Sequence, residues 1–197
     1  MLKKRLIISG ILICIFLFFS IVALSNDVKY DFRKTNWGMS KEQVRATEDK
    51  EPDFKDDNGL GYDIKINGDD YYCSYSFLED KLYNGGYAST EIHTNENLYI
   101  DDYEELKETL IKKYGKPKSD LGTFWKNDLY KDDKSQWGFA ISIGDLVYGA
   151  RWETPTTIIT LMLRGDNYKI LLILSYYSKE LEEWVKQIKE EKAKEDF

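Results

Sequence analysis

The chain of 197 residues is poor in the residue types that build catalytic and metal centres. It has one histidine, His93, and two cysteines, Cys14 and Cys73. One histidine cannot form a His-rich metal site or a pair of histidines. Because Cys14 lies in a long apolar run, Cys73 has no partner for a disulfide within the rest of the chain. We interpret Cys73 as a small buried hydrophobe, with an intermolecular disulfide as the alternative.

The sequence also lacks the common catalytic motifs. It has no glycine-rich phosphate loop and no nucleophile-elbow pattern, so a Ser-His-Asp arrangement around His93 stays a formal alternative only. Acidic doublets offer oxygen ligands for calcium, but none shows the alternating ladder and terminal Glu of a calcium loop. Each falls at an expected turn or helix cap: Asp56-Asp57, Asp69-Asp70, Asp101-Asp102 and Asp132-Asp133. The sequence therefore predicts no enzyme and no catalytic, cofactor-binding or metal-binding residues.

Positive charge is scarce outside the N-terminus. Without the three basic residues at positions 3–5, 25 basic side chains remain against 35 acidic ones, a net charge of −10. An acidic domain repels phosphate backbones, so no nucleic-acid partner is expected. By the same argument from total charge, anionic lipid headgroups are repelled.

The N-terminal 25 residues give the clearest indication of function. The basic residues 3–5 precede an uncharged run, Leu6–Leu24. This pattern is typical of an export signal or a membrane anchor, and the positive charge places the rest of the chain outside the cytoplasm. We expect a single-pass membrane protein with its C-terminal domain outside, or a secreted protein if the chain is cleaved after Ser25. Lipidation at Cys14 is disfavoured because no small residue precedes it.

The remaining chain predicts a single domain of the α+β class. We expect an antiparallel β-meander sheet with two or three helices packed on one face. The predicted divisions are a signal peptide or anchor at 1–25, a linker at 26–34, the domain at 35–188 and a charged tail at 189–197.

Three helices are expected. Ser40 and Gln43 have the spacing of a capping box, which starts a short first helix. The second begins at Asp101 or Asp102, ends at Gly115, and has an apolar stripe three and four residues apart. The third follows Ser178. The two stripes are Tyr103, Leu106, Leu110 and Tyr114 in the second helix, and Leu181, Trp184, Val185 and Ile188 in the third.

Strand-like patterns fill most of the rest of the domain. The predicted strands are 62–66, 71–78, 82–92, 123–126, 136–143, 146–153, 156–164 and 168–177. Short turns between them favour antiparallel pairing. The continuously apolar segment Ile170–Leu174 predicts a central strand covered on both faces.

Two hairpins resemble one another in sequence. Ile64–Tyr71 and Leu161–Tyr168 each read as a strand, a Gly-Asp turn and a second strand, downstream of a helix. They indicate two helix-plus-hairpin repeats, although Gly-Asp turns also recur by chance.

Two short motifs resemble small exported bacterial proteins of the BamE/SmpA or β-lactamase-inhibitor-like type. The first is Trp37-Gly38-Met39-Ser40-Lys41-Glu42-Gln43-Val44, and the second is Tyr114-Gly115-Lys116-Pro117. The resemblance implies helices packed on one face of an antiparallel sheet and a non-catalytic binding role. The lipid-anchored Cys that is usual in BamE-type proteins is missing, so their role in outer-membrane assembly does not carry over.

The leading functional hypothesis is therefore a non-enzymatic, exported or membrane-anchored binding domain. We expect it to engage a protein partner through the exposed face of its sheet, because aromatic residues are abundant in the strands. A cell-wall or glycan-binding module is the alternative, resting on the same 15 Tyr and 5 Trp. A hydrolase built on paired carboxylates is less favoured.

Overall fold

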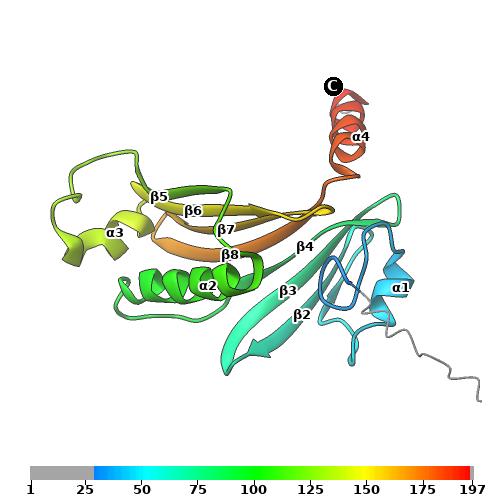
Figure 1. Cartoon of the computed structure of the whole chain (residues 1–197), viewed down its shortest axis with the longest axis horizontal. Coiled ribbons are helices and arrows are strands. Elements are labelled where there is room, and N and C mark those ends of the chain that lie inside the picture. The colour runs from blue at the N-terminus through cyan, green and yellow to red at the C-terminus, as the bar shows by residue number, and fades with distance from the viewer. Residues whose placement is uncertain (1–28, 196–197) are drawn as a thin grey trace, which may run out of the picture.

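The computed structural model describes residues 29–195, so the predicted membrane segment at Leu6–Leu24 lies outside the described residues. The described chain forms one eight-stranded antiparallel sheet in the order β1-β2-β3-β4-β8-β7-β6-β5, with four α-helices (Figure 1). The α+β class and the antiparallel sheet are confirmed. The elements are α1 Lys41–Arg45, β1 Phe54–Lys55, β2 Gly59–Ile66, β3 Asp69–Leu78, β4 Lys81–Ser89, α2 Leu98–Tyr114, β5 Ser119–Trp125, η1 Lys134–Gln136, α3 Trp137–Ser142, β6 Leu146–Glu153, β7 Thr157–Asp166, β8 Lys169–Ser178 and α4 Glu182–Glu195.

No helix among residues 29–195 combines the length and apolar character needed to cross a bilayer.

The sheet consists of two meanders joined through their last strands. Strands β1–β4 form one and β5–β8 the other, and β4 pairs with β8 from Asn84 opposite Tyr177 to Ala88 opposite Ile173. From either edge of the sheet, the strands therefore follow one another in chain order up to the middle, so that β1 to β4 of the first meander correspond to β5 to β8 of the second. By position in the meander, the β7–β8 hairpin corresponds to the β3–β4 hairpin. The similar sequences Ile64–Tyr71 and Leu161–Tyr168, however, lie in the β2–β3 and β7–β8 hairpins. The Gly-Asp similarity thus relates hairpins at different places in the two meanders.

The first helix follows its capping signal. The Ser40 hydroxyl accepts from the Gln43 amide at 3.2 Å, and the Gln43 side chain accepts from the Ser40 amide at 2.9 Å. These bonds satisfy amides that have no partner within the helix. Val44 lies on the buried side of this helix and has no exposed surface.

The second helix begins earlier than the sequence predicts. It starts at Leu98 rather than at Asp101 or Asp102, and ends before Gly115, whose φ is +80°. The Asn97 side chain does not cap it. Instead, its oxygen accepts from the Gly138 amide at 2.6 Å. A contact with α3 therefore fixes the start of α2, and only the tertiary structure brings that residue close.

The predicted strand at 136–143 is wrong, because this segment forms η1 and α3. The Asp133 side chain accepts from the Ser135 amide at 3.0 Å and starts the turn. Ala140 and Ile141 of α3 are fully buried. A short apolar run does not distinguish a strand from a buried helix, so the packing against Asn97 decides.

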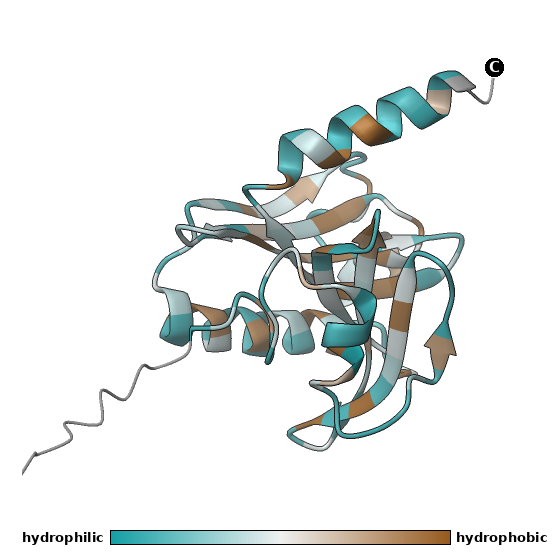
Figure 2. Ribbon diagram, turned by 90° about the vertical axis from the view of Figure 1, so that its right-hand side faces the viewer, coloured by the Kyte–Doolittle hydropathy of each residue, from teal (hydrophilic) through white to brown (hydrophobic). Residues whose placement is uncertain are grey.

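One hydrophobic core lies between the sheet and three helices. Side chains of α1, α2 and α3 join the same buried cluster, including Val44, Tyr103, Leu110 and Ile141. Helix α4 lies on the opposite face, where Val185 shares a hollow with Ile158 of β7. Figure 1 shows α2 and α4 on opposite sides of the sheet. Figure 2 shows α4 projecting beyond the sheet, with a mostly hydrophilic ribbon.

Ordered contacts extend beyond the predicted domain limits of 35 and 188 at both ends. Phe32, in the predicted linker, is buried, and its ring lies 5.1 to 5.3 Å from those of Tyr75, Tyr87 and Tyr176. At the other end, the predicted cap Ser178 accepts from the amide of Leu181 at 3.2 Å, and α4 begins one residue later, at Glu182. Helix α4 then continues through Glu195, beyond the predicted start of the tail at Lys189.

Candidate functional site

The face of the sheet opposite α1, α2 and α3 carries an uncovered group of apolar side chains. Cross-strand pairs place Gly149, Met162 and Ile173 directly opposite one another on β6, β7 and β8. Their neighbours in each strand point into the core, so these three positions face outward. We call this side of the sheet the outer face.

The apolar side chains on β5–β8 form a continuous group that we call the apolar strip. Phe124 lies opposite Val147, and the Leu121 side chain lies over Gly149, 3.0 Å from where a Cβ would be. Opposite and diagonal neighbours on adjacent strands lie close enough for side-chain contact. The strip consists of Leu121, Phe124, Val147, Met162, Leu171 and Ile173. Leu121 is 60% exposed, Phe124 54% and Leu171 42%.

The exposure of Leu171 corrects one expectation. The Ile170–Leu174 segment is central, because β8 pairs with both β4 and β7. However, it is covered on the core face only, where Leu172 and Leu174 are buried. The continuous apolar run therefore marks an apolar outer face rather than a second covering layer. That run was the one indication of the strip in the sequence, while Leu121 and Phe124 were missed.

Helix α4 covers only one end of the outer face. Ile158 of β7 is 5% exposed and Val185 of α4 is 9% exposed. Lys81 of β4 lies 4.8 Å from the ring of Trp184 and continues this contact. The strip lies beyond α4, so the outer face is packed at one end and open at the other.

Two arginines flank the strip on the outer face. Arg164 is opposite Leu171, and Arg151 is opposite Thr160, one row beyond Met162. Arg151 pairs with Glu153 at 3.1 Å, whereas Arg164 forms no ion pair with any residue in the described part of the chain. The rim of the strip therefore carries one arginine that a carboxylate neutralises, Arg151, and one without an ion pair among residues 29–195, Arg164.

Strand β5 is an edge strand that continues the strip. It pairs with β6 on one side and has a bulge at Asp120–Gly122. Asp120 is held by Lys107 of α2 at 2.8 Å. The opposite edge, β1, has only two residues. A strand as short as β1 discourages edge-to-edge pairing, so β5, with seven residues, offers the longer open edge, although its bulge interrupts the edge near Asp120.

The single histidine forms a pair with an aspartate. His93 Nε2 lies 2.6 Å from Asp102 Oδ2, and its ring packs edge-on against Tyr99 at 4.6 Å. A hollow of about 140 Å³ adjoins the pair. Burial, followed by the charges of Asp69 and Asp102, raises the pKa of Tyr71 on its wall. The pair ties the loop before α2 to that helix, which is sufficient to explain it structurally.

The acidic doublets have structural partners. Asp56 accepts from the Asn58 amide at 2.8 Å, Asp70 pairs with Lys65 at 2.6 Å, and Asp133 starts η1. Among residues 29–195, no three His, Cys, Asp or Glu side chains are grouped so that they could hold a metal ion.

Cys73 is fully buried beside a polar cluster. Burial raises the pKa of its thiol to about 12, so the thiol stays protonated at neutral pH. Nearby, Arg33 donates twice to Glu48 at 2.9 Å, and the Tyr75 hydroxyl also donates to Glu48. These contacts tie the start of the described chain to the turn after α1 and to β3.

Comparison of the chain with models of protein families, with curated proteins and with solved structures gives no match. The resemblance to the BamE/SmpA type thus rests on the two motifs alone.

Proposed function

We propose that this protein is a non-enzymatic binding domain on the extracytoplasmic side of a membrane, and that it engages a protein partner through the apolar strip. The observation that carries the proposal is the open end of the outer face. Leu121, Phe124 and Leu171 are among its exposed side chains, on strands that the core holds rigidly. Larger exposed apolar patches with a polar rim are typical of protein interaction sites.

The rim indicates the chemistry of the partner. Arg164 flanks the strip without an ion pair among the described residues, so the partner surface should combine apolar side chains with an acidic one. Charge complementarity of this kind speeds association and fixes register. An extended segment of the partner can also pair with the open edge of β5, since strand addition supplies main-chain hydrogen bonds.

Glycan binding receives less support, because three of the five tryptophans serve as packing anchors. Trp152 is 1% exposed, and its indole donates to the Gly115 carbonyl at 2.9 Å. The Trp37 indole donates to Thr157 at 3.0 Å, and Trp137 donates to the Lys131 carbonyl at 3.1 Å. Their indole N–H groups are used within the domain, which gives these three rings a structural role without a glycan.

The extracytoplasmic location rests on the predicted segment Leu6–Leu24 and the basic residues before it. N-terminal sequencing of the mature protein tests whether the segment is retained or is removed after Ser25.

The binding proposal is tested by cross-linking in intact cells. A photoreactive amino acid at Met162 should capture one specific protein, because this position lies at the centre of the strip. Introducing Leu171→Asp into the same chain should abolish the capture. An apolar anchor in the core of an interface contributes about 2 kcal/mol or more, which corresponds to roughly thirty-fold in affinity.

The matched control is Ile92→Asp. Ile92 is 90% exposed and lies in the loop between β4 and α2, so the variant adds the same charge at an exposed apolar position elsewhere. Capture should persist in this variant. Equal capture by both variants, or no specific product from Met162, would refute binding through the strip.

A further inference from the structure

A second feature lies at the pole where the described chain begins. A pocket of about 280 Å³ is formed there by three segments: the chain at 29–33, the end of α2 and the turn between β6 and β7. Its floor is aromatic and comes from the core, with Phe32, Tyr87 and Tyr176. The pocket therefore joins a rigid apolar base to a polar rim.

Two lysines on the rim have no acidic partner. Lys29 and Lys113 line the pocket, and neither forms an ion pair with any residue in the range 29–195. Lys113 lies 5.0 Å from the ring of Tyr114, which also lines the pocket. The one acidic residue of the wall, Asp31, accepts from the Trp37 amide at 3.0 Å and from Thr156 at 2.5 Å.

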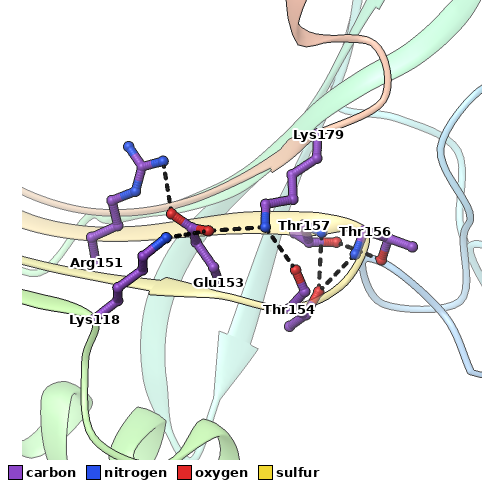
Figure 3. A network of polar contacts seen from close by, with 7 residues as sticks. All are labelled: Lys118, Arg151, Glu153, Thr154, Thr156, Thr157 and Lys179. Atoms are coloured by element: carbon purple, nitrogen blue, oxygen red, sulfur yellow. Dashed lines mark hydrogen bonds and ion pairs between the residues drawn. The ribbon is translucent and has the colours of Figure 1, made fainter.

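A second cluster of cations lies around Glu153, next to the turn between β6 and β7. Glu153 pairs with Lys118 at 2.8 Å, with Lys179 at 2.9 Å and with Arg151 at 3.1 Å (Figure 3). Lys179 also donates to the Thr154 carbonyl at 3.1 Å, and Thr154 is part of the pocket wall. Three cations share one carboxylate, so the cluster keeps a positive charge.

Glu153 stays ionised near neutral pH, so its ion pairs with the three cations persist there. Hydrogen bonds from Lys118 and Lys179 lower its pKa to about 2. On its other side, Arg151 shares a hollow with Glu182 of α4. The excess positive charge next to the pocket therefore comes from Lys118 and Lys179, together with Lys29 and Lys113.

We infer that this basic pole binds the phosphate of an anionic glycerophospholipid headgroup, with the phosphate among the lysines and the glycerol against the aromatic base. Lysine binds phosphate as a point charge, and a ligand pocket combines apolar walls with a few placed polar groups. The inference rests on the proposed membrane location. Lys29 follows Leu24 by five positions, a length of chain that spans at most about 18 Å.

Local charge explains how an acidic domain can approach such a surface. A net charge of −10 on the chain beyond residue 5 repels an anionic bilayer at a distance. At physiological salt, however, charges act over a Debye length of about 8 Å. The residues nearest the bilayer therefore decide the contact, and Lys29 and Lys113 line the pocket without an ion pair among residues 29–195.

Lysine labelling tests the inference with the full chain in nanodiscs of phosphatidylcholine, with or without an equal part of phosphatidylglycerol. Phosphatidylglycerol should slow the labelling of Lys113 and Lys118 several-fold. Lys126, at the other end of β5, serves as the internal reference and should not change. Equal labelling of Lys113 and Lys118 in both kinds of nanodisc would overturn the inference.

Two variants should change the effect of phosphatidylglycerol in opposite directions. Replacing Lys113 and Lys118 with Gln should remove the slowing by phosphatidylglycerol, now measured at Lys179, since each basic residue near an anionic surface contributes about five-fold to the association. Glu153→Gln, which removes the shared carboxylate, should strengthen it about five-fold by the same rule. A loss of binding in Glu153→Gln would count against the inference, provided that its circular dichroism is unchanged.

Two further arms separate the alternatives. Glycerol 1-phosphate is titrated by calorimetry into the full chain in a neutral detergent. Binding there without protection in nanodiscs would identify a free phosphate ester as the ligand and overturn the membrane source. Leu171→Asp disrupts the apolar strip and should leave protection unchanged, so the two proposals can fail independently.

Discussion

The two meanders share a core face and differ on the outer face. One row of cross-strand pairs shows the change directly, running through Met162, Ile173, Ala88, Tyr72 and Asp63. It passes from apolar side chains on β7 and β8 to an acidic one on β2. On the core face, both meanders contribute fully buried leucines such as Leu82 and Leu161. Folding requires apolar residues on the core face of each strand, whereas the residues on the outer face can differ between the two meanders.

The largest expected effect tests the equivalence of the two core faces. Leu82→Ala and Leu161→Ala should each lower the free energy of unfolding by about 3 kcal/mol, because each leaves a cavity in a close-packed core. Met162→Ala, on the outer face, should cost less than about 1 kcal/mol. Urea unfolding of the full chain in a neutral detergent, followed by tryptophan fluorescence, measures all three. A much smaller effect at Leu82 would show that the first meander contributes less to the core.

A smaller effect compares two glycines, one on each face. A Cβ at Gly85 would overlap the ring of Phe32, which three tyrosine rings hold in place. Gly85→Ala should therefore cost about 1–3 kcal/mol. At Gly149 the contact is 3.0 Å to the end of the exposed Leu121 side chain, which can move away. Gly149→Ala should cost well under about 1 kcal/mol, and an equal cost for both would show that Leu121 is held rigidly.

The smallest effect concerns the pH dependence of Glu153. Its pKa falls from 4.5 to about 2 in the folded protein, so its contribution to stability is fully present above pH 4.5 and is lost as the pH falls towards 2. The midpoint of urea unfolding should therefore differ between the natural chain and Glu153→Gln at pH 6, and converge near pH 2. A constant difference across this range would show that the three cations do not act through the ionised carboxylate.

The elements that the sequence predicts well are those whose signals are local. The capping residue Ser40 and the alternation in β6 and β7 depend on neighbours a few residues away, and these elements form where expected. The start of α2 and the helix α3 were predicted incorrectly because each depends on the bond between Asn97 and Gly138, which are 41 residues apart. The spacing of apolar and polar residues within one segment cannot predict a contact between two distant segments.

For function, the sequence indicated a sheet face without indicating which part of it. The apolar strip needs side chains from β5, β6, β7 and β8 on one side of the sheet, and the pairing of these strands sets their register. The basic pole likewise joins Lys113, Lys118 and Lys179, which lie far apart in the chain. Total charge predicts repulsion from anionic lipids, whereas the proposed headgroup site rests on the local arrangement of lysines, because composition averages over positions that folding separates.

By itself the sequence determined the α+β class, the antiparallel strands and the shortage of catalytic residue types. These follow from composition and from periodicity within single elements. Only the tertiary structure decided that β8 is open on one face, that Phe32 belongs to the core and that lysines gather at one pole. Each of these features depends on which segments lie side by side, and this is set by packing between residues that are distant in the chain.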